Sequence, residues 1–382
     1  MGRPSGPSGD RFGVALWGEW IERFRTGLMS SDDRLTAARI LGMIGSSLLA
    51  SVLILTLMPK AHLGQSVQSA RGDYVHDPSM IRAGDTFYVF STGDPSGIIG
   101  DGNIQIRSST DLRHWRYLGT IFERKPAWVP QKVRSLWAPD VSYYRGRYQV
   151  YYSASIFGTN DSAIGLATNE TLDPNSPRYR WVDRGVVIRS TPADDWNAID
   201  PSFTVDADGQ PWLVFGSFWS GIKMVKLNPE TGKLAEMPPR LYSLAYRPDP
   251  PHAIEAPSLI YRKPYYYLFV SFDFCCRRAR STYNIRVGRA KSITGPYLDG
   301  SGKPMMQGGG TLILSSSGEM IGPGGQAIYR DGDTYYLVHH FYDASDSGRA
   351  KLQIHRLLWT SDGWPRVGPA IISYDELRQS EP

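Results

Sequence analysis

The chain has 382 residues, of which 41% are apolar, 21% charged and 12% aromatic, and its net charge is +5. This composition excludes a disordered or low-complexity chain, because the apolar content suffices for a packed core. The small charge, without a basic stripe, argues against a nucleic-acid partner, and two cysteines exclude a disulfide scaffold and a cysteine-based zinc site.

An uncharged apolar stretch near the N-terminus predicts export. Residues 40–58 read ILGMIGSSLLASVLILTLM and follow two basic residues, Arg34 and Arg39. The length lies between that of a signal-peptide core and that of a bilayer-spanning helix, so a signal peptide and a signal anchor both stay open. We expect a polar segment over 1–39, this signal or anchor helix, and a linker over 59–72. The rest of the chain should be secreted, periplasmic or membrane-anchored facing outward.

The body of the chain, residues 73–382, contains five related segments. Each begins with a short element, in most copies polar and ending in proline, followed by an apolar strand, a turn and an aromatic-rich strand. The five openings are His76-Asp77-Pro78, Trp137-Ala138-Pro139, Ile199-Asp200-Pro201, Glu255-Ala256-Pro257 and Gly322-Pro323-Gly324. About four strands in a unit of roughly 60 residues is typical of a propeller blade. The sequence therefore predicts an all-β, five-bladed β-propeller, with a β-sandwich as the alternative.

Three carboxylates lie in these openings: Asp77, Asp200 and Glu255. The first strand of each blade lines the central channel, so the openings should converge at one mouth of it. Glycoside hydrolysis needs two carboxyl groups across the scissile bond, one protonated and one ionised, and a third acid can raise the pKa of a neighbour. Three acids at matching repeat positions favour this chemistry over separate turn-capping roles. Tryptophans close to these motifs, which can stack on sugar rings, are Trp137, Trp196 and Trp219.

Nine longer motifs occur in a fixed order along the body of the chain. They are VHDPSMI, LWAPDVSYY, SAIGLAT, NAIDPSF, FGSFWSGIKM, IEAPSLI, FVSFDFCCR, GPGGQAI and LVHHFYDA. Over roughly Asp73 to Pro365 the chain thereby resembles glycoside hydrolase family 43. Within that family, the order of the motifs together with NAIDP, SFWSGI and FDFCCR is similar to the endo-1,5-α-L-arabinanases rather than to the xylosidase-like members.

The resemblance implies a role for each of the three acids. Asp77 would be the general base that activates water, Glu255 the general acid that protonates the leaving oxygen, and Asp200 the group that tunes the pKa and orientation of Glu255. The implied activity is hydrolysis of α-1,5-L-arabinofuranosyl linkages in arabinan with inversion. An exo-acting arabinofuranosidase, a xylan-active relative and a non-catalytic sugar-binding propeller are the alternatives.

The resemblance also implies substrate contacts and a metal site. The expected contacts with arabinose are Asp77, Trp137, Gly158 through its backbone, Asn197, Asp200, Ser217, Phe218 and Trp219. The second histidine of LVHH, His340, would point into the channel and bind one calcium ion largely through waters. Calcium prefers oxygen ligands, so an ordinary hydrogen-bonded histidine is the alternative.

Four further residues near the motifs have structural interpretations. Asp140 follows its proline and should hold the start of its blade by hydrogen bonds, with a substrate role as the alternative. His76 should be a hydrogen-bonded channel histidine. The adjacent Cys275 and Cys276 can form a vicinal disulfide or stay as two buried thiols. We expect a monomer whose partner is arabinan or an arabino-oligosaccharide and which meets a membrane only through residues 40–58.

Overall fold

The computed structural model describes residues 74–97, 99–374 and 376. The predicted polar segment, apolar helix and linker (1–39, 40–58 and 59–72) lie outside these residues, so the signal or anchor helix stays a prediction. Among the described residues, none of the helices has the length and apolar character needed to cross a bilayer.

In the described part of the chain, twenty strands form five antiparallel sheets of four successive strands each. Blade 1 has β1 (Ser79–Ala83), β2 (Thr86–Ser91), β3 (Gln105–Ser109) and β4 (Arg116–Thr120). Blade 2 has β5 (Leu136–Tyr144), β6 (Arg147–Ala154), β7 (Ser162–Asn169) and β8 (Val182–Ser190). Blade 3 has β9 (Ser202–Val205), β10 (Pro211–Phe215), β11 (Ile222–Lys226) and β12 (Tyr242–Ala245).

The last two sheets follow the same order. Blade 4 has β13 (Ile254–Arg262), β14 (Tyr265–Phe272), β15 (Asn284–Ala290) and β16 (Thr311–Leu314). Blade 5 has β17 (Met320–Asp331), β18 (Thr334–Asp343), β19 (Arg349–Trp359) and β20 (Pro365–Ala370). The described loops contain four single-turn 3₁₀ helices: η1 (Gly100–Gly102), η2 (Arg278–Arg280), η3 (Met305–Gln307) and η4 (Ala344–Asp346).

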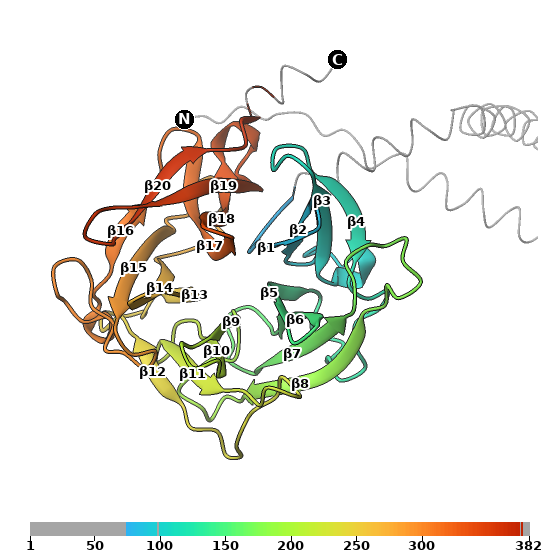
Figure 1. Cartoon of the computed structure of the whole chain (residues 1–382), viewed down its shortest axis with the longest axis horizontal. Helices are drawn as coiled ribbons and strands as arrows, with labels where there is room; N and C mark the ends of the chain where they lie inside the picture. The colour runs from blue at the N-terminus through green and yellow to red at the C-terminus, as the bar shows by residue number, and fades with distance from the viewer. Residues whose placement is uncertain (1–73, 98, 375, 377–382) are drawn as a thin grey trace, which may run out of the picture. The chain divides into compact units, whose positions relative to one another are not determined.

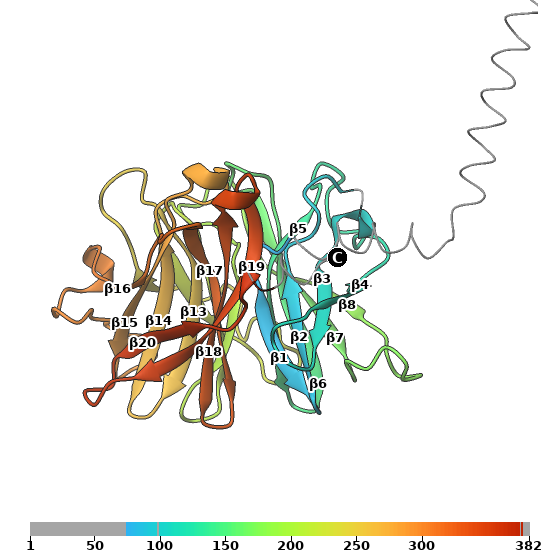
Figure 2. The ribbon, with the colours of Figure 1, turned by 90° about the horizontal axis from the view of Figure 1, so that it is seen from above.

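The five sheets stand around a common axis, with the first strand of each blade innermost and the fourth outermost (Figure 1). Seen at right angles to that view, the inner strands run side by side through the thickness of the ring (Figure 2). The five-bladed propeller is thus confirmed. The turns between first and second strands also fall where Gly, Pro and Asp occur, because these residues adopt turn conformations readily.

The hydrophobic core lies between blades rather than in one central mass. Strand β2 shows why, since its apolar side chains alternate between the two faces of the sheet. Phe87 and Val89 belong to the cluster shared with blade 5, whereas Tyr88 and Phe90 belong to the cluster shared with blade 2. Five such clusters fill the spaces between neighbouring sheets. This packing holds the inner strands in place around the channel.

Candidate active site

The openings of the five inner strands meet at a narrow cavity in the channel, as the repeat predicts. The cavity is lined by Asp77, Pro78, Ala138–Asp140, Asp200–Ser202, Ala256–Ser258 and Gly325–Ala327. Segments as far apart as the first and last blades therefore contribute to one small space.

One residue in each opening has a positive φ, and it defines the true register of the repeat. These residues are Asp77 (φ 48°), Ala138 (43°), Asp200 (57°), Ala256 (51°) and Gly325 (57°). The prediction that the fifth opening is Gly322-Pro323-Gly324 is therefore wrong by two positions. The prediction that all three acids occupy matching repeat positions is also wrong. In blade 4 the equivalent residue is Ala256, and Glu255 precedes it by one position. Only Asp77 and Asp200 are equivalent.

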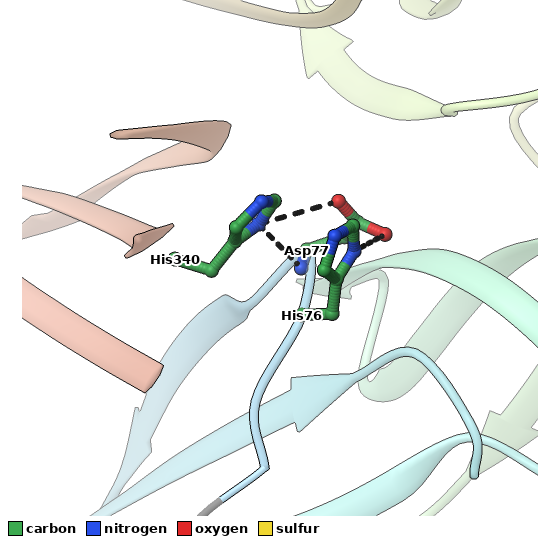
Figure 3. Close-up of side chains that lie close together, drawn as sticks. All are labelled: His76, Asp77 and His340. Carbon is green, nitrogen blue, oxygen red and sulfur yellow. Dashed lines mark hydrogen bonds and ion pairs between the residues drawn. The ribbon is translucent and has the colours of Figure 1, made fainter. Parts of the chain in front are cut away.

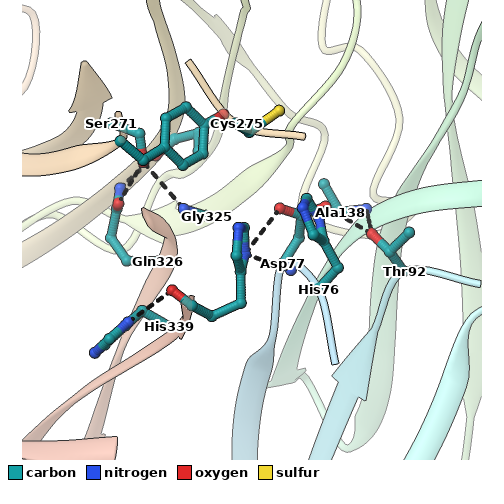
Figure 4. A network of polar contacts seen from close by, with 12 residues as sticks. His76, Asp77, Thr92, Ala138, Ser271, Cys275, Gly325, Gln326 and His339 are labelled. Atoms are coloured by element: carbon teal, nitrogen blue, oxygen red, sulfur yellow. Dashed lines mark hydrogen bonds and ion pairs between the residues drawn. The ribbon is translucent and has the colours of Figure 1, made fainter. Parts of the chain in front are cut away.

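In each of these five residues the backbone N–H donates a hydrogen bond to a side chain of the preceding blade. The five hydrogen bonds form a closed ring around the channel, which we call the amide belt. Its donors and acceptors are Ala138 to Thr92 (3.0 Å), Asp200 to Ser153 (2.9 Å), Ala256 to Asp200 (3.1 Å), Gly325 to Ser271 (3.0 Å) and Asp77 to His340 Nδ1 (3.1 Å). A non-glycine residue at positive φ is strained by roughly 1–2 kcal/mol, and the belt holds this conformation in place. Figure 4 shows Thr92 beside Ala138 and Ser271 beside Gly325.

Asp77 lies beside two stacked histidine rings, His76 from its own opening and His340 from β18 (Figure 3). Its Oδ2 accepts hydrogen bonds from His76 Nδ1 (2.8 Å) and Thr92 Oγ1 (2.7 Å). Its other oxygen, Oδ1, lies 3.5 Å from the Nδ1 of His340. A Cβ atom on Gly325 would lie 2.4 Å from this Oδ1. One carboxylate oxygen is thus fixed by hydrogen bonds, and the other faces the narrow space beside Gly325.

The surroundings of Asp77 favour its ionised form. Burial raises the pKa of this carboxyl, but the adjacent His76 ring, the hydrogen bond from it, His340 and the Thr92 hydroxyl together lower the pKa to about 2. Asp77 is therefore a carboxylate throughout the neutral range.

Glu255 has the opposite tendency. Its side chain is buried, and its two oxygens accept hydrogen bonds from Ser217 Oγ (2.7 Å) and from the Tyr283 hydroxyl. Burial raises the pKa of Glu255, the two hydroxyls lower it in part, and the charge of Asp77 raises it again, so the net shift is upward. Two carboxyl groups at one mouth of the channel are thereby pushed toward different protonation states.

Asp200 interacts with Asp77 and Glu255 through charge, and with the backbone beside Glu255 through a hydrogen bond. Its Oδ2 accepts the N–H of Ala256, the residue that follows Glu255. Burial, the charge of Glu255 and the charge of Asp77 all raise the pKa of Asp200. Because both Asp200 and Glu255 resist ionisation, the pair retains protons to higher pH than an exposed carboxyl would.

Asp140 has the structural role that was expected of it. Its carboxyl accepts hydrogen bonds from the Phe203 N–H (2.6 Å) and the Ser79 hydroxyl (3.2 Å), which joins blades 1, 2 and 3. Burial raises the pKa of Asp140 to about 7, although these hydrogen bonds lower it in part.

The residues expected to contact substrate lie in different environments. Asn197 is buried and donates to Thr159 O at 3.5 Å, and its Oδ1 has no hydrogen-bond partner in the part of the chain that the structure describes. Phe218 and Trp219 are half-buried at positive φ (52° and 40°), and Gly158 is exposed at φ 80°. The half-buried Trp137 donates its indole N–H to Ser135 Oγ at 3.0 Å, Ser217 binds Glu255, and Trp196 belongs to the core between blades 2 and 3.

Sequence reasoning missed three hydroxyl residues that hold the acids. Thr92 bridges Asp77 and the amide of Ala138, Tyr283 binds Glu255, and Tyr342 donates to or accepts from His76 Nε2 at 2.8 Å. Thr92 could have been found, because it directly follows β2 at the place that Ser153, Ser271 and His340 occupy in the second strands of their blades. The two tyrosines belong to no repeated motif.

Cys275 and Cys276 form a disulfide in the loop after β14, so the choice between a vicinal disulfide and free thiols is resolved. Cys275 is half-buried and Cys276 is exposed, which also rules out a buried pair.

The predicted metal ligand, His340, is fully buried against Asp77 and His76, whose ring centroid lies 3.7 Å away, and it is not among the described residues that line the cavity. Within the described chain these three residues bring potential ligand atoms within 4.8 Å of one another. The His340 Nδ1 accepts the Asp77 N–H, which places the ring proton on Nε2, and this Nε2 has no hydrogen-bond partner among the described residues. The set fits an ion on Nε2, with waters as the other ligands, when the ring proton moves to Nδ1, which lies 3.5 Å from Asp77 Oδ1. It does not fit calcium bound directly by several protein oxygens, because it offers one carboxylate.

Gly325 cannot be enlarged without disturbing this site. An alanine Cβ would lie 2.4 Å from Asp77 Oδ1 and 2.6 Å from the His340 ring. We expect Gly325→Ala to reduce hydrolysis of the substrate by at least about 10²-fold, since about 1 Å of misplacement can cost that much. Initial rates and thermal unfolding check this.

The matched control is Gly332→Ala. Gly332 has nearly the same φ (58° against 57°), but no atom lies within 4 Å of the added Cβ. Gly332→Ala should therefore lose only the stability that an alanine costs at positive φ, and its initial rate should equal that of the wild type. Equal rate losses in both variants would contradict the steric explanation.

Comparisons with known proteins agree with this geometry. The model for glycosyl hydrolases family 43 matches residues 71–365. An extracellular endo-α-(1→5)-L-arabinanase of Bacillus subtilis is 46% identical over 324 residues, covering 84% of this chain and 95% of that protein. An extracellular exo-α-(1→5)-L-arabinofuranosidase of Cellvibrio japonicus is 45% identical over 307 residues, covering 77% and 86%.

A solved structure shows the same fold. The α-L-arabinanase of Cellvibrio cellulosa in complex with arabinohexaose superimposes with a TM-score of 0.72 at 43% identity, covering 80% of this chain and 97% of that one. The family model covers most of the chain, and both relatives are well above 30% identity over more than two thirds of it. The chain, with its five-bladed ring and three carboxyls at the channel mouth, therefore belongs to glycosyl hydrolases family 43.

Proposed function

We propose that this protein is an inverting endo-arabinanase that hydrolyses α-1,5-L-arabinofuranosyl linkages in arabinan. The observation that carries the proposal is the contrast between two acids at one channel mouth: the pKa of Asp77 is lowered to about 2, whereas the pKa of Glu255 is raised. An inverting glycosidase needs this pair of states. The similarity to arabinanases supplies the substrate class.

Asp77 would act as the general base. Its Oδ2 is held by His76 and Thr92, so the carboxylate cannot rotate freely, and Oδ1 remains to accept a proton from water. As this proton moves to Oδ1, the water oxygen forms a bond to the anomeric carbon on the face opposite the leaving group.

Glu255 would act as the general acid. Its proton passes to the glycosidic oxygen as the bond from that oxygen to the anomeric carbon breaks. Asp200 would support this role in two ways. It fixes the backbone next to Glu255 through the Ala256 N–H, and its proximity makes ionisation of the pair costly.

The substrate would lie across the mouth of the channel. Asn197 has a buried, unpaired Oδ1 that can accept a hydrogen bond from a sugar hydroxyl. Phe218, Trp219 and Trp137 offer half-buried aromatic faces, and the exposed backbone of Gly158 lies next to Thr159, to which Asn197 donates. These contacts are proposals from their positions around the three acids.

Incubation with debranched arabinan tests the activity. An endo enzyme produces a spread of oligosaccharides at the earliest times, whereas an exo enzyme releases one product size from the start. The exo alternative has support of its own, because the exo-acting relative is nearly as similar as the endo-acting one (45% and 46% identity). Chromatography of products against time separates the two.

Proton NMR during the first turnovers tests the stereochemistry. Inversion predicts that the new reducing end appears first as the β-anomer and then equilibrates. Initial appearance of the α-anomer would contradict the proposed roles of Asp77 and Glu255, and the absence of any new reducing end would favour a sugar-binding protein.

We also infer export, because both relatives described above are extracellular and the apolar segment at 40–58 precedes the catalytic body. N-terminal sequencing of the exported protein distinguishes a cleaved signal peptide from an anchor. We propose that the propeller acts as a monomer, which light scattering checks.

Calcium remains a proposal. An ion held by His340 Nε2 and waters would require the ring proton on Nδ1, facing Asp77 Oδ1 (3.5 Å), and would add positive charge beside the three acids. Calorimetric titration of chelator-treated protein with calcium checks this, and no binding would leave His340 as the acceptor for the Asp77 N–H alone.

Removal of the Tyr283 hydroxyl should change the pH profile. Its hydrogen bond lowers the pKa of Glu255, so Tyr283→Phe raises that pKa. The general acid must be protonated, and the alkaline limb of kcat should therefore move to higher pH. The control is Tyr297→Phe, since Tyr297 is also buried but donates to Ile293 O instead. An alkaline limb that stays in place would contradict the contact with the acid.

A further inference from the structure

The disulfide between Cys275 and Cys276 lies close to the proposed general base. The Cys276 Sγ is 3.9 Å from the His76 Nε2 and 4.0 Å from the Tyr342 hydroxyl. A loop of blade 4 thus reaches the boundary between blades 5 and 1.

A chain of hydrogen bonds connects this loop to the base. The Cys276 N–H donates to the Tyr342 hydroxyl oxygen at 2.7 Å. The Tyr342 hydroxyl lies 2.8 Å from His76 Nε2, and His76 Nδ1 lies 2.8 Å from Asp77 Oδ2. The Tyr342 hydroxyl accepts from this amide, and its own proton can point to His76 Nε2 at 2.8 Å or to the more distant Cys276 Sγ at 4.0 Å, so the shorter contact directs it to His76. His76 then carries its proton on Nδ1, where it can donate to the Asp77 carboxylate.

The hydrogen bond that begins this series, from the Cys276 N–H to the Tyr342 hydroxyl, depends on the backbone conformation of Cys276. Its φ is 67°, in the left-handed region that non-glycine residues rarely adopt. Bonding of adjacent cysteines closes an eight-membered ring that restricts the backbone between them. The disulfide therefore holds the amide in the conformation from which it donates to Tyr342, and two free thiols would remove this restraint.

We propose that the Cys275–Cys276 disulfide, acting through Tyr342 and His76, positions the Asp77 carboxylate for catalysis and makes turnover dependent on the oxidised state. None of these residues except Asp77 is a catalytic residue; Cys276, Tyr342 and His76 are positioning residues. The inference rests on the proposed role of Asp77 as general base.

The first test is Tyr342→Phe, assayed on debranched arabinan. The variant removes both hydrogen bonds of the Tyr342 hydroxyl, to the Cys276 N–H and to His76 Nε2, and so breaks the link to the charged Asp77. We therefore expect kcat to fall about tenfold while KM changes less than twofold. The control is Tyr335→Phe on the same strand. Tyr335 is similarly buried (6% exposed against 3%), and its ring packs on Trp359, away from the site. It should leave kcat unchanged.

The second test is reduction of the wild-type protein with dithiothreitol. The dithiol becomes a cyclic disulfide, and its two electrons and two protons convert the protein S–S bond into two thiols. The chain has only two cysteines, so this bond is the sole disulfide target, and Cys276 is exposed to the reagent. We expect kcat to fall about tenfold, as in Tyr342→Phe, and to return after reoxidation.

A combination of the two tests identifies the route. If the disulfide acts through Tyr342, reduction of Tyr342→Phe should cause little further loss, because the chain is already broken. The double variant Cys275→Ala/Cys276→Ala should have the lowered kcat and no response to dithiothreitol. Thermal unfolding of each protein shows whether it is folded, and reduction of the wild type still tests the inference if Tyr342→Phe is not.

Several results would overturn the inference. They are an unchanged kcat in both reduced wild type and Tyr342→Phe, additive losses from the two changes, or a loss that appears entirely in KM. Failure of the proposed function looks different, because Asp77→Asn would then retain activity. If Asp77→Asn is inactive and reduction has no effect, the base is right and only the positioning role is wrong.

Discussion

Asp77→Asn should lower kcat on debranched arabinan by about 10³-fold or more, at the upper part of the range for removal of a general base. The amide is nearly the size of the carboxylate, so the contacts with His76 and Thr92 can survive in altered form. What it lacks is the capacity to take a proton from water. Steady-state kinetics with product analysis measure the loss.

The control for Asp77→Asn is Asp85→Asn. Asp85 is fully exposed in the turn after β1, where it meets only Arg82 at 3.4 Å. This change should leave kcat within twofold. More than a tenth of wild-type activity in Asp77→Asn would contradict the role of Asp77, provided that the protein is folded by its thermal transition.

Glu255→Gln should lower kcat on arabinan by about 10²–10⁴-fold, because the leaving oxygen then receives no proton. The loss should depend on the leaving group. In an aryl arabino-oligosaccharide the leaving group can be a strongly acidic phenol, which departs without protonation. Cleavage of such a substrate by the variant should therefore be largely retained. Release of the phenol, followed by absorbance, measures this difference.

Asp77→Asn provides the matched comparison for Glu255→Gln. Loss of the base blocks attack by water, so a better leaving group should not restore its activity. The two variants must therefore respond differently to the same pair of substrates. Similar rescue of both, or of neither, would show that the acid and base have been assigned wrongly.

The sequence was sufficient to predict the fold, and the reason is physical. Each blade must bury both faces of its sheet, which requires the same order of strand, turn and aromatic-rich strand in every segment. The proline at four of the openings marks where each inner strand begins. Blade 5 has Gly324-Gly325-Gln326 instead, and without a proline its register was placed two positions too early.

The candidate site was predictable only in part. Asp77 and Asp200 share a repeat position, whereas Glu255 precedes its equivalent by one residue, so the match among the three acids was looser than the motifs suggested. The hydroxyls on Glu255 come from the loop after β10 and from the residue just before β15. Such contacts between distant segments leave no periodic trace, so only the folded chain reveals them.

The amide belt also bears on when the protein becomes active during its synthesis. The N–H of Asp77 finds its acceptor on a residue 263 positions farther along the chain. Domains synthesised from the N-terminus form their early parts first. The first blade can assemble long before β18 leaves the ribosome, yet its catalytic carboxylate stays incompletely anchored until then. Hydrolytic competence is therefore acquired at the end of biosynthesis, and a chain that terminates early would carry most of the propeller without a working base.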